Sequence, residues 1–361
     1  MDPPPEVPPP PPRDWSLVDE DGPERPAPRG FIHLSVAKEL YGVLQDVGAD
    51  PEVIIAEAGL DPRLFGNPRN LISVFVLGNF LHLCAERTNC PHISLSVGQQ
   101  ATLNSLRLVG SLMRVSETLG DALRALEAHL KAQYRGAMVH VEVDSSVAVL
   151  SIALYEPMGR GAGHIYEGGL ATLVGAVREL CVPDWAPTEV LIPRREPADA
   201  GPYRRFFRAP VRFNEETAAV VFPAGLLSWR LSGANPTART GLEQRIRELE
   251  QAAPPDLVDE LRRIVRAEVL KKRPVAQEVA EHFSVDRRTL ARHLHTLGTG
   301  YKTVADQVRF EVAQQLLAET DIPFVQISAA LDFSEPAAFT HAFEKWAGVA
   351  PSIWRARHSA G

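Results

Sequence analysis

The C-terminal third of the sequence contains the same pattern twice: a short helix, a three-residue turn and a second helix. The first copy extends from Val275 to Thr296 and the second from Pro323 to Trp346. In each copy a small residue lets the helices cross closely and an apolar turn residue fills the corner: Ala280 and Val285 in one, Ala329 or Ala330 and Phe333 in the other. This spacing is typical of a helix-turn-helix unit, whose second helix can enter the major groove of DNA.

A continuous amphipathic helix is expected between the two copies, from Thr303 to Ala318. Four apolar residues recur along one side of it at helical spacing: Val304, Val308, Val312 and Leu316. A helix of this length measures about 24 Å, and recognition helices held roughly 34 Å apart lie one turn apart on a duplex. The sequence therefore predicts that one chain reads two consecutive segments of the major groove.

Charge is distributed unevenly along the chain. The 361 residues carry a net charge of −7 at pH 7. Residues 262–309 nevertheless contain eleven Lys or Arg and only five acids, whereas residues 1–30 contain seven acids and three Arg. A polyanionic partner such as double-stranded DNA is therefore expected at the C-terminal third.

The rest of the sequence predicts a tail and a mixed domain in front of the helical region. Residues 1–30 hold eleven of the 30 prolines and few apolar residues, which is typical of a disordered tail. Residues 31–234 mix helical and alternating patterns, most clearly a β-hairpin from Met138 to Leu154. Residues 235–256 predict a linker helix and residues 257–361 only helices. The predicted fold class is an α+β effector-binding and dimerisation domain followed by an all-α domain with two helix-turn-helix units.

Local signals place several elements of the mixed domain. Asp50 is expected to cap a helix that begins at Pro51, and Ser116 to cap a later one. The buried side of that later helix is expected to carry Leu119, Leu123, Leu126 and Leu130. Short strands are expected at residues 190–192, 211–213 and 220–222.

The linker helix has a narrow apolar stripe formed by Leu242, Ile246 and Leu249. Such a stripe can pack on its own domain, which is favoured, or on a second subunit. We expect a homodimer in which the N-terminal domain provides a subunit interface, with this stripe contributing to it.

Two runs in the C-terminal third resemble the DNA-binding domain of AraC-type transcription regulators: SVDRRTLARHLHTLGTGYKTVADQVRFEVAQQLL and IPFVQISAALDFSEPAAFTHAFEKWAGVAPSIWR. The second run is close to the family signature. It departs from it at Asp332, where the family commonly has glycine, and at Pro336, which the first turn of a helix tolerates. The resemblance implies a DNA-binding transcription regulator, with RNA polymerase as a further candidate partner of an activator.

Residues 34–250 resemble the N-terminal domain of the AraC subgroup that includes regulators of ornithine metabolism and mycobacterial regulators. Four segments carry this resemblance: DPEVIIAEAGLDPRLF, SETLGDALRALEAHL, PDWAPTEV and YRRFFRAPVRFNEETAAVVFPAGLL. The subgroup differs from the arabinose-type cupin barrel, so no sugar-binding residues are carried over. The resemblance implies a domain that binds a small-molecule effector or dimerises.

The family resemblance also indicates which side chains contact DNA. Arg288 and Arg292 lie four residues apart at family positions that reach base edges, although a phosphate contact or a solvated face remains the alternative. Arg287 and Thr289 are expected at the DNA backbone or exposed. In the second recognition helix the corresponding face carries Ala337, Thr340 and His341, of which the last two suit either bases or phosphates. Lys302 and Arg309 are expected to meet phosphate.

Other motifs are weak. The set His82, Cys84, Cys90 and His92 lacks the C-x2-C spacing of zinc sites, and we expect no metal or cofactor. Glycines at 159, 161 and 163 indicate a loop rather than a nucleotide-binding turn. Three cysteines and the lack of any signal or membrane-spanning pattern predict a soluble cytoplasmic protein.

Three functions fit these observations. The leading one is an effector-responsive regulator that binds DNA. The alternatives are a constitutive DNA-binding protein whose N-terminal domain only dimerises, and an enzyme with an appended DNA-binding module. The last would need a catalytic constellation that the sequence does not contain, so the chain is not expected to be an enzyme.

Overall fold

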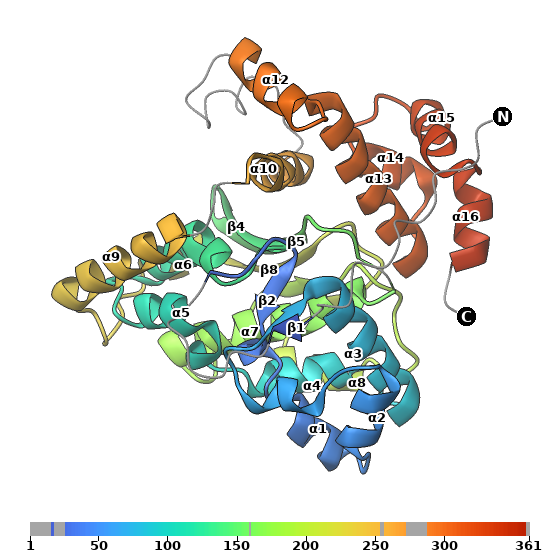
Figure 1. Ribbon diagram of the computed structural model, residues 1–361. Helices are drawn as coiled ribbons and strands as arrows, with labels where there is room; N and C mark the ends of the chain where they lie inside the picture. The colour runs from blue at the N-terminus through green and yellow to red at the C-terminus, as the bar shows by residue number, and fades with distance from the viewer. Residues whose placement is uncertain (1–15, 18–25, 159, 253–255, 272–286, 359–361) are drawn as a thin grey trace.

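The computed structural model describes residues 16–17, 26–158, 160–252, 256–271 and 287–358. They form an N-terminal α/β domain with two sheets and a helical C-terminal domain (Figure 1), so the predicted fold class is confirmed. Helix α10 (Leu257–Lys271) lies between the larger sheet and the other C-terminal helices.

The smaller sheet is antiparallel and has three strands. Strand β3 (Leu71–Ser73) lies in its centre, between β2 (Phe31–His33) and β1 (Ser16–Leu17). Residues 16–17 fall inside the stretch expected to be disordered, so that expectation does not hold for them. Their backbone pairs with Leu71 and Ile72, because the central strand has polar groups on both edges that need partners.

The larger sheet has five strands in the order β4-β5-β8-β6-β7 and is open rather than closed into a barrel. Its first two strands, β4 (Ala137–Asp144) and β5 (Val147–Leu154), form the predicted hairpin. The other three correspond to the predicted short strands: β6 (Glu189–Leu191), β7 (Val211–Arg212) and β8 (Ala218–Pro223). Only β6 and β7 pair in parallel.

Eight α-helices within residues 26–158 and 160–252, not counting α9, surround the sheets. They are α1 (Leu40–Asp46), α2 (Pro51–Glu57), α3 (Val74–Thr88), α4 (Ile93–Gln100), α5 (Arg107–Arg114), α6 (Leu119–His129), α7 (Ala162–Leu180) and α8 (Gly201–Phe207). Helix α7 packs against β5 and β8, and α4 packs along α7. Gly98 permits that approach, because a Cβ atom there would lie 2.3 Å from the carbonyl oxygen of Gly168.

Two helix starts differ in how well the sequence predicted them. The cap of α2 is as expected, since the Asp50 carboxylate accepts a hydrogen bond from the Glu52 amide at 3.0 Å. The cap of α6 is Thr118 rather than Ser116. Thr118 and Asp121 form a reciprocal capping box, whereas the Ser116 hydroxyl donates back to the carbonyl oxygen of Leu112.

Helix α9 (Pro236–Ala252) packs on its own domain. Ile246 is fully buried and Leu249 nearly so, against Leu112, Ala125 and Ala132. The favoured intramolecular alternative is therefore confirmed, and the expectation that this stripe contributes to a subunit interface is wrong. The apolar faces of α5 and α6 already cover it.

The C-terminal domain contains α10, α12 (Arg287–Thr296), α13 (Tyr301–Glu319), α14 (Phe324–Ala330), α15 (Pro336–Ala347) and α16 (Pro351–His358). Helix α13 takes part in two separate cores. Its first half packs against α10 and α12, and its second half packs against α14 and α15. One continuous helix thus joins the two helix-turn-helix regions, as predicted.

Candidate DNA-binding surface and ligand cavity

The second helix-turn-helix unit has the predicted geometry. Phe333, in the turn, contacts the rings of Phe339 and Trp346 at centroid distances of 5.8 and 6.2 Å. Phe339 and Phe343 are fully buried and hold α15 on the core. On its other side Ala337 and His341 are exposed, while Thr340 is half-buried. The Thr340 hydroxyl donates within its own helix, to the carbonyl oxygen of Pro336 at 3.0 Å.

The departure at Asp332 has a structural explanation. The backbone of Asp332 has φ = 60°, which lies in the left-handed region that residues other than glycine rarely adopt. Aspartate is among the residues that tolerate this conformation, which explains how the turn keeps its shape without the family's usual glycine.

The first unit is described only in part, because residues 272–286, with the expected first helix and turn, lie outside the described residues. Its recognition helix is α12, which begins with Arg287. Leu290 and Leu294 are buried against α13. Arg288 and Arg292 are exposed, and within the described residues neither forms an ion pair. Thr289 is half-buried.

The two recognition helices, α12 and α15, lie on the side of the C-terminal domain that faces away from the N-terminal domain (Figure 1). The expected phosphate contacts are on α13, where Lys302 is exposed and Arg309 is half-buried. The arrangement leaves both recognition helices accessible to a duplex.

Part of the basic stretch 262–309 is not available to DNA. Arg262 and Arg266 are only 4% and 3% exposed, because they dock α10 on the N-terminal domain. Arg262 donates to the carbonyl oxygen of Tyr155 at 3.0 and 2.7 Å and pairs with Glu311 of α13. Arg266 donates to the carbonyl oxygen of Leu154 at 3.0 Å.

A second contact joins the two domains at the end of α13. Arg195 donates to the carbonyl oxygens of Ala318 and Thr320 at 2.6 and 3.1 Å, and pairs with Asp321 at 2.8 Å. The positive charge of Arg195 is also stabilised there by the negative C-terminal end of the α13 dipole. The Tyr166 hydroxyl reaches Gln315 of α13 at 3.3 Å.

Buried charges accompany this contact. Glu167 accepts hydrogen bonds from Arg194 at 2.5 Å and from the Tyr203 hydroxyl at 2.7 Å. Burial nevertheless raises the pKa of Glu167 and raises the pKa of Glu319 to about 7. Glu319 lies over the first turn of α7, where a Cβ atom on Gly163 would be 3.1 Å from its Oε2. Gly163 therefore belongs to a helix and an interface, not to a loop.

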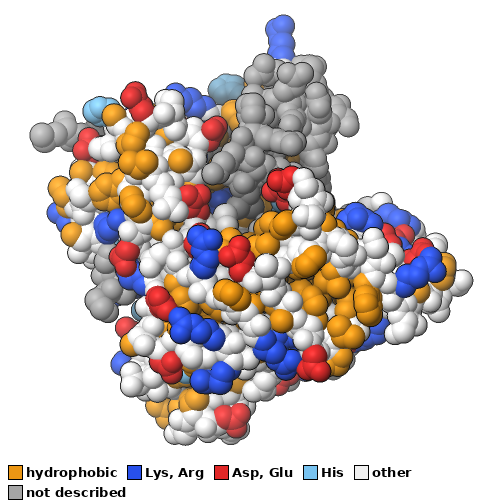
Figure 2. Space-filling model, turned by 180° about the vertical axis from the view of Figure 1, so that it is seen from behind, with side chains coloured by type: hydrophobic (Ala, Val, Ile, Leu, Met, Phe, Trp, Pro, Cys, Tyr) orange, Lys and Arg blue, Asp and Glu red, His pale blue; other side chains and the backbone are white. Residues whose placement is uncertain are grey.

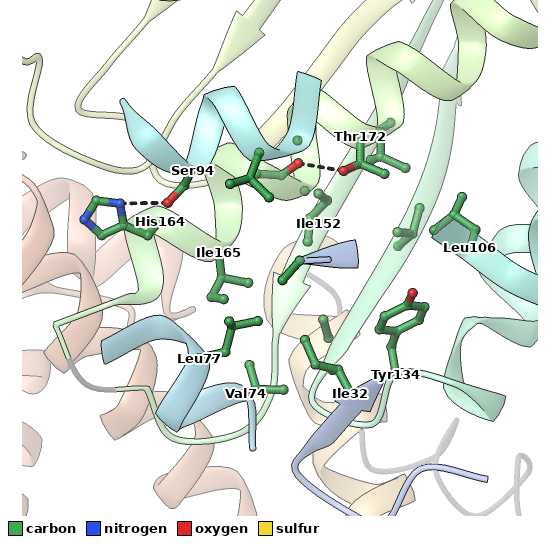
Figure 3. Close-up of a pocket in the computed structure, with 18 of the residues that line it drawn as sticks. Ile32, Val74, Leu77, Ser94, Leu106, Tyr134, Ile152, His164, Ile165 and Thr172 are labelled. Carbon is green, nitrogen blue, oxygen red and sulfur yellow. Dashed lines mark hydrogen bonds between the residues drawn. The ribbon is translucent and has the colours of Figure 1, made fainter. Parts of the chain in front are cut away.

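A partly open cavity of about 130 Å³ lies inside the N-terminal domain (Figure 3). Both sheets and helices α3, α4, α6 and α7 contribute to its wall. The lining residues are Ile32, Ala37, Val74, Leu77, Leu81, Ser94, Val97, Gly98, Leu106, Leu126, Leu130, Tyr134, Ala137, Val139, Ile152, His164, Ile165, Gly168, Gly169, Thr172 and Leu173. None of these residues is recognisable from the sequence as a ligand-binding residue.

The few polar side chains of this wall bond to other protein groups. Ser94 and His164 form a hydrogen bond of 3.0 Å at one end of the cavity (Figure 3). The Tyr134 hydroxyl donates to the carbonyl oxygen of Ser105 at 2.9 Å, and Thr172 donates to that of Gly168 at 2.9 Å. Burial, followed by the charge of Arg194, holds the pKa of His164 well below its usual range. Burial raises the pKa of Tyr134 to about 12, so both groups are neutral at pH 7.

The weak motifs of the sequence do not converge on a site. Cys90 and His92 are in contact, with 3.6 Å between Sγ and Nε2, while His82 pairs with Glu86. Throughout the part of the chain that the structure describes, no three His, Cys, Asp or Glu side chains are arranged to hold a metal ion. Among the same residues no helix is both long enough and apolar enough to cross a bilayer.

Known proteins provide an independent comparison. A family described as the arabinose-binding domain of AraC transcription regulator, N-terminal, matches residues 48–231, and one described as a helix-turn-helix domain matches residues 279–357. The ornithine utilization regulator of Pseudomonas aeruginosa is 24% identical over 328 residues, which are 90% of this chain and 96% of that one. The regulator VqsM of the same organism is 25% identical over 270 residues, covering 72% and 82% of the two chains.

Among solved structures, the transcriptional regulator CdpR from Pseudomonas aeruginosa is 22% identical, with a TM-score of 0.44. The match covers 89% of this chain and 98% of that one. The N-terminal family alone matches more than half of the 361 residues. The chain therefore belongs to the AraC family of transcription regulators, with an N-terminal ligand-binding domain and a C-terminal helix-turn-helix domain that binds DNA.

Proposed function

We propose that an effector bound in the cavity of the N-terminal domain controls the placement of the DNA-binding domain through the first two turns of α7. The proposal rests on one observation: residues of these two turns both line the cavity and contact the DNA-binding domain. His164, Ile165 and Gly168 line the cavity. Between them, Tyr166 and Glu167 belong to the contact with α13 and the buried charges beside it.

The wall of the cavity and the domain contact are thus parts of one rigid element. A ligand that moves or rotates α7 also moves the Tyr166 hydroxyl, which bonds Gln315, and the first turn of α7, against which Glu319 lies. Regulation requires that the ligand prefer one placement of the DNA-binding domain over the other. This supports the effector-responsive regulator over the constitutive DNA-binding protein.

Replacement of Tyr166 by phenylalanine tests whether ligand binding is transmitted from the cavity to the DNA-binding domain through α7, which we call the proposed route. The change keeps the ring but removes the hydroxyl that bonds both the Leu154 amide and Gln315. We expect Tyr166→Phe to bind ligand within about twofold of wild type while losing most of the ligand's effect on DNA affinity, since one hydrogen bond contributes about 0.5–1.5 kcal/mol. Fluorescence anisotropy with a labelled duplex selected from random sequences measures this.

Tyr41→Phe is the matched control, because the Tyr41 hydroxyl donates to Glu52 of α2, and neither residue lines the cavity or the contact with α13. It should respond to ligand as the wild type does. A Tyr166→Phe protein with an unchanged ligand response would contradict the proposed route.

For DNA, we propose that Arg288 and Arg292 read base edges in the first major-groove segment. Arg287, Thr289, Lys302 and Arg309 are proposed as backbone contacts. The exposed face of α15 with Ala337, Thr340 and His341 would then occupy the second segment. Exposure of the two arginines and the continuous helix α13 support this assignment.

We further propose domain limits of 1–30, 31–234, 235–256 and 257–361, with residues 16–17 of the first range contributing a strand to the smaller sheet of the second. We also propose that the protein is cytoplasmic and has no enzymatic activity. The matched families fall inside the second and fourth ranges, and α9 is packed on the second. Contact with RNA polymerase is proposed for promoters that the protein activates.

The proposed homodimer needs an interface other than the stripe on α9. Viewed from behind, hydrophobic side chains gather on the N-terminal domain beside α9 (Figure 2). Exposed apolar residues of this domain include Val143, Val147 and Trp229, at 52%, 40% and 45%. Sedimentation velocity at micromolar concentration is expected to give a dimer, and a monomer both free and on DNA would refute the proposal.

A further inference from the structure

We infer that the cavity takes an uncharged and mainly apolar molecule about as large as a substituted benzene ring. The inference rests on the proposal that this cavity holds the effector, and it adds the chemical class. It also separates this chain from the two small molecules that the descriptions of a matched family and a relative name, arabinose and ornithine.

Charge complementarity excludes an ionic ligand. None of the 21 residues that line the cavity is Asp, Glu, Lys or Arg. Glu167, which lies beside the lining residues on α7, is buried and paired with Arg194. An ammonium or carboxylate group placed among aliphatic side chains would lose its hydration without gaining a counter-charge, which costs far more than an amide or hydroxyl would. Ornithine carries three such groups and does not suit this wall.

Hydrogen bonding excludes a sugar. The hydroxyls of Tyr134 and Thr172 already donate to backbone carbonyl oxygens, and Ser94 is bonded to His164. A pentose would bury several hydroxyls against Leu, Ile and Val side chains, and each unpaired one costs about 1–3 kcal/mol. The Ser94–His164 pair is the one place along this wall where two side chains can share a bond with a ligand, so a single polar group is accommodated there.

The volume of the cavity limits the size of the ligand. The cavity of about 130 Å³ compares with apolar cavities of about 150 Å³ that stay dry and bind benzene. The cavity thus accommodates one ring with a short substituent. Larger molecules would need movement of the walls, and α7 is one of them.

Toluene, L-arabinose and L-ornithine are suitable test compounds for the full chain. Toluene is expected to raise the melting temperature by about 2–4 °C at tenfold excess over its Kd, whereas the other two leave it unchanged. Val139→Phe fills the cavity from β4 and should abolish the toluene shift. Val143→Phe, the control four residues along the same strand, changes a 52% exposed side chain that does not line the cavity and should keep the shift.

A second variant guards against a misfolded Val139→Phe protein. Leu77→Ala enlarges the cavity and should extend binding to naphthalene, which wild type rejects. A melting shift with arabinose or ornithine, or a toluene shift that survives Val139→Phe in a folded protein, would overturn the inference. Failure of all three compounds to bind would overturn it as well.

Anisotropy with the selected duplex then separates this inference from the proposed function. Toluene that binds and changes DNA affinity supports both. Toluene that binds, is lost in Val139→Phe and leaves DNA affinity unchanged supports the ligand class and contradicts the route through α7.

Discussion

Replacement of Arg262 by alanine is expected to lower the free energy of unfolding by about 3–5 kcal/mol, because it leaves buried partners without a counter-charge or donor. Arg262 pairs with Glu311 of α13 and gives two hydrogen bonds to the carbonyl oxygen of Tyr155 in the N-terminal domain. Folded domains are commonly stable by only about 5–15 kcal/mol. The variant therefore loses a large share of its stability, which urea unfolding measures.

The pH dependence of the stability loss in Arg262→Ala shows whether the unpaired carboxylate of Glu311 causes it. Burial already raises the pKa of Glu311 although Arg262 opposes it, and the remaining neighbours are Gln307 and Glu156. Without Arg262 this pKa rises further above its value in the unfolded chain. A group with a raised pKa in the folded state loses its stabilising contribution as pH rises through that pKa. The difference between wild type and Arg262→Ala should therefore be smaller near pH 5 than near pH 8.

Arg263 is the matched control on the same helix. Its ion-pair partner is Glu260, one turn away in α10, so the pair itself does not cross between the domains. Arg263→Ala should cost less than Arg262→Ala, because the 21% exposed Arg263 leaves behind a carboxylate that solvent still reaches. Equal losses for both variants, or a gap that does not change with pH, would show that Arg262 does not hold the domains together.

Arg262 also shows what sequence reasoning could not see. In the sequence it counts as one more cation of a basic stretch that suggests DNA binding. Whether a cation faces solvent or a buried carboxylate depends on residues far along the chain, here Tyr155 and Glu311. Local charge counts therefore predicted the right partner for the domain while overestimating the surface available to it.

The elements that the sequence predicted are those with strong local patterns. The hairpin of β4 and β5 alternates in polarity, and α13 and α15 carry apolar residues at helical spacing. Helix α5 was not predicted, because it is short and contains Gly110. A Cβ atom at Gly110 would lie 1.8 Å from the carbonyl oxygen of Leu103. Its glycine serves a tertiary contact that no local pattern reveals.

The sequence favours a pocket among the apolar helices around the Met138–Leu154 hairpin, and Val139 and Ile152 of that hairpin do line the cavity. The other lining residues could not be identified from the sequence, for a related reason. The cavity is formed where side chains from both sheets and four helices fail to meet. Each of its apolar residues looks like an ordinary core residue in the sequence, and Ser94 and His164 are 70 positions apart. The DNA-contact residues differ from this, because they share one helix and one periodicity.

Replacement of Arg292 by alanine is expected to weaken binding to the preferred site by about 5- to 150-fold, or 1–3 kcal/mol, and to relax base preference at one or two positions. Arg292 is exposed on α12, opposite the buried Leu290 and Leu294. Its planar guanidinium can donate two hydrogen bonds to guanine, which a shorter side chain cannot replace.

Lys302→Ala is the comparison that separates base reading from charge. Lys302 is exposed at the first turn of α13, and a phosphate contact there weakens all sequences alike and lowers the salt slope by about one unit. Binding titrations on the preferred duplex and on random duplexes, at several salt concentrations, measure both effects. If Arg292→Ala lost equal affinity on the two kinds of duplex, Arg292 would be a phosphate contact. Base selection by α12 would then have to depend on Arg288, the other arginine that we propose to read bases.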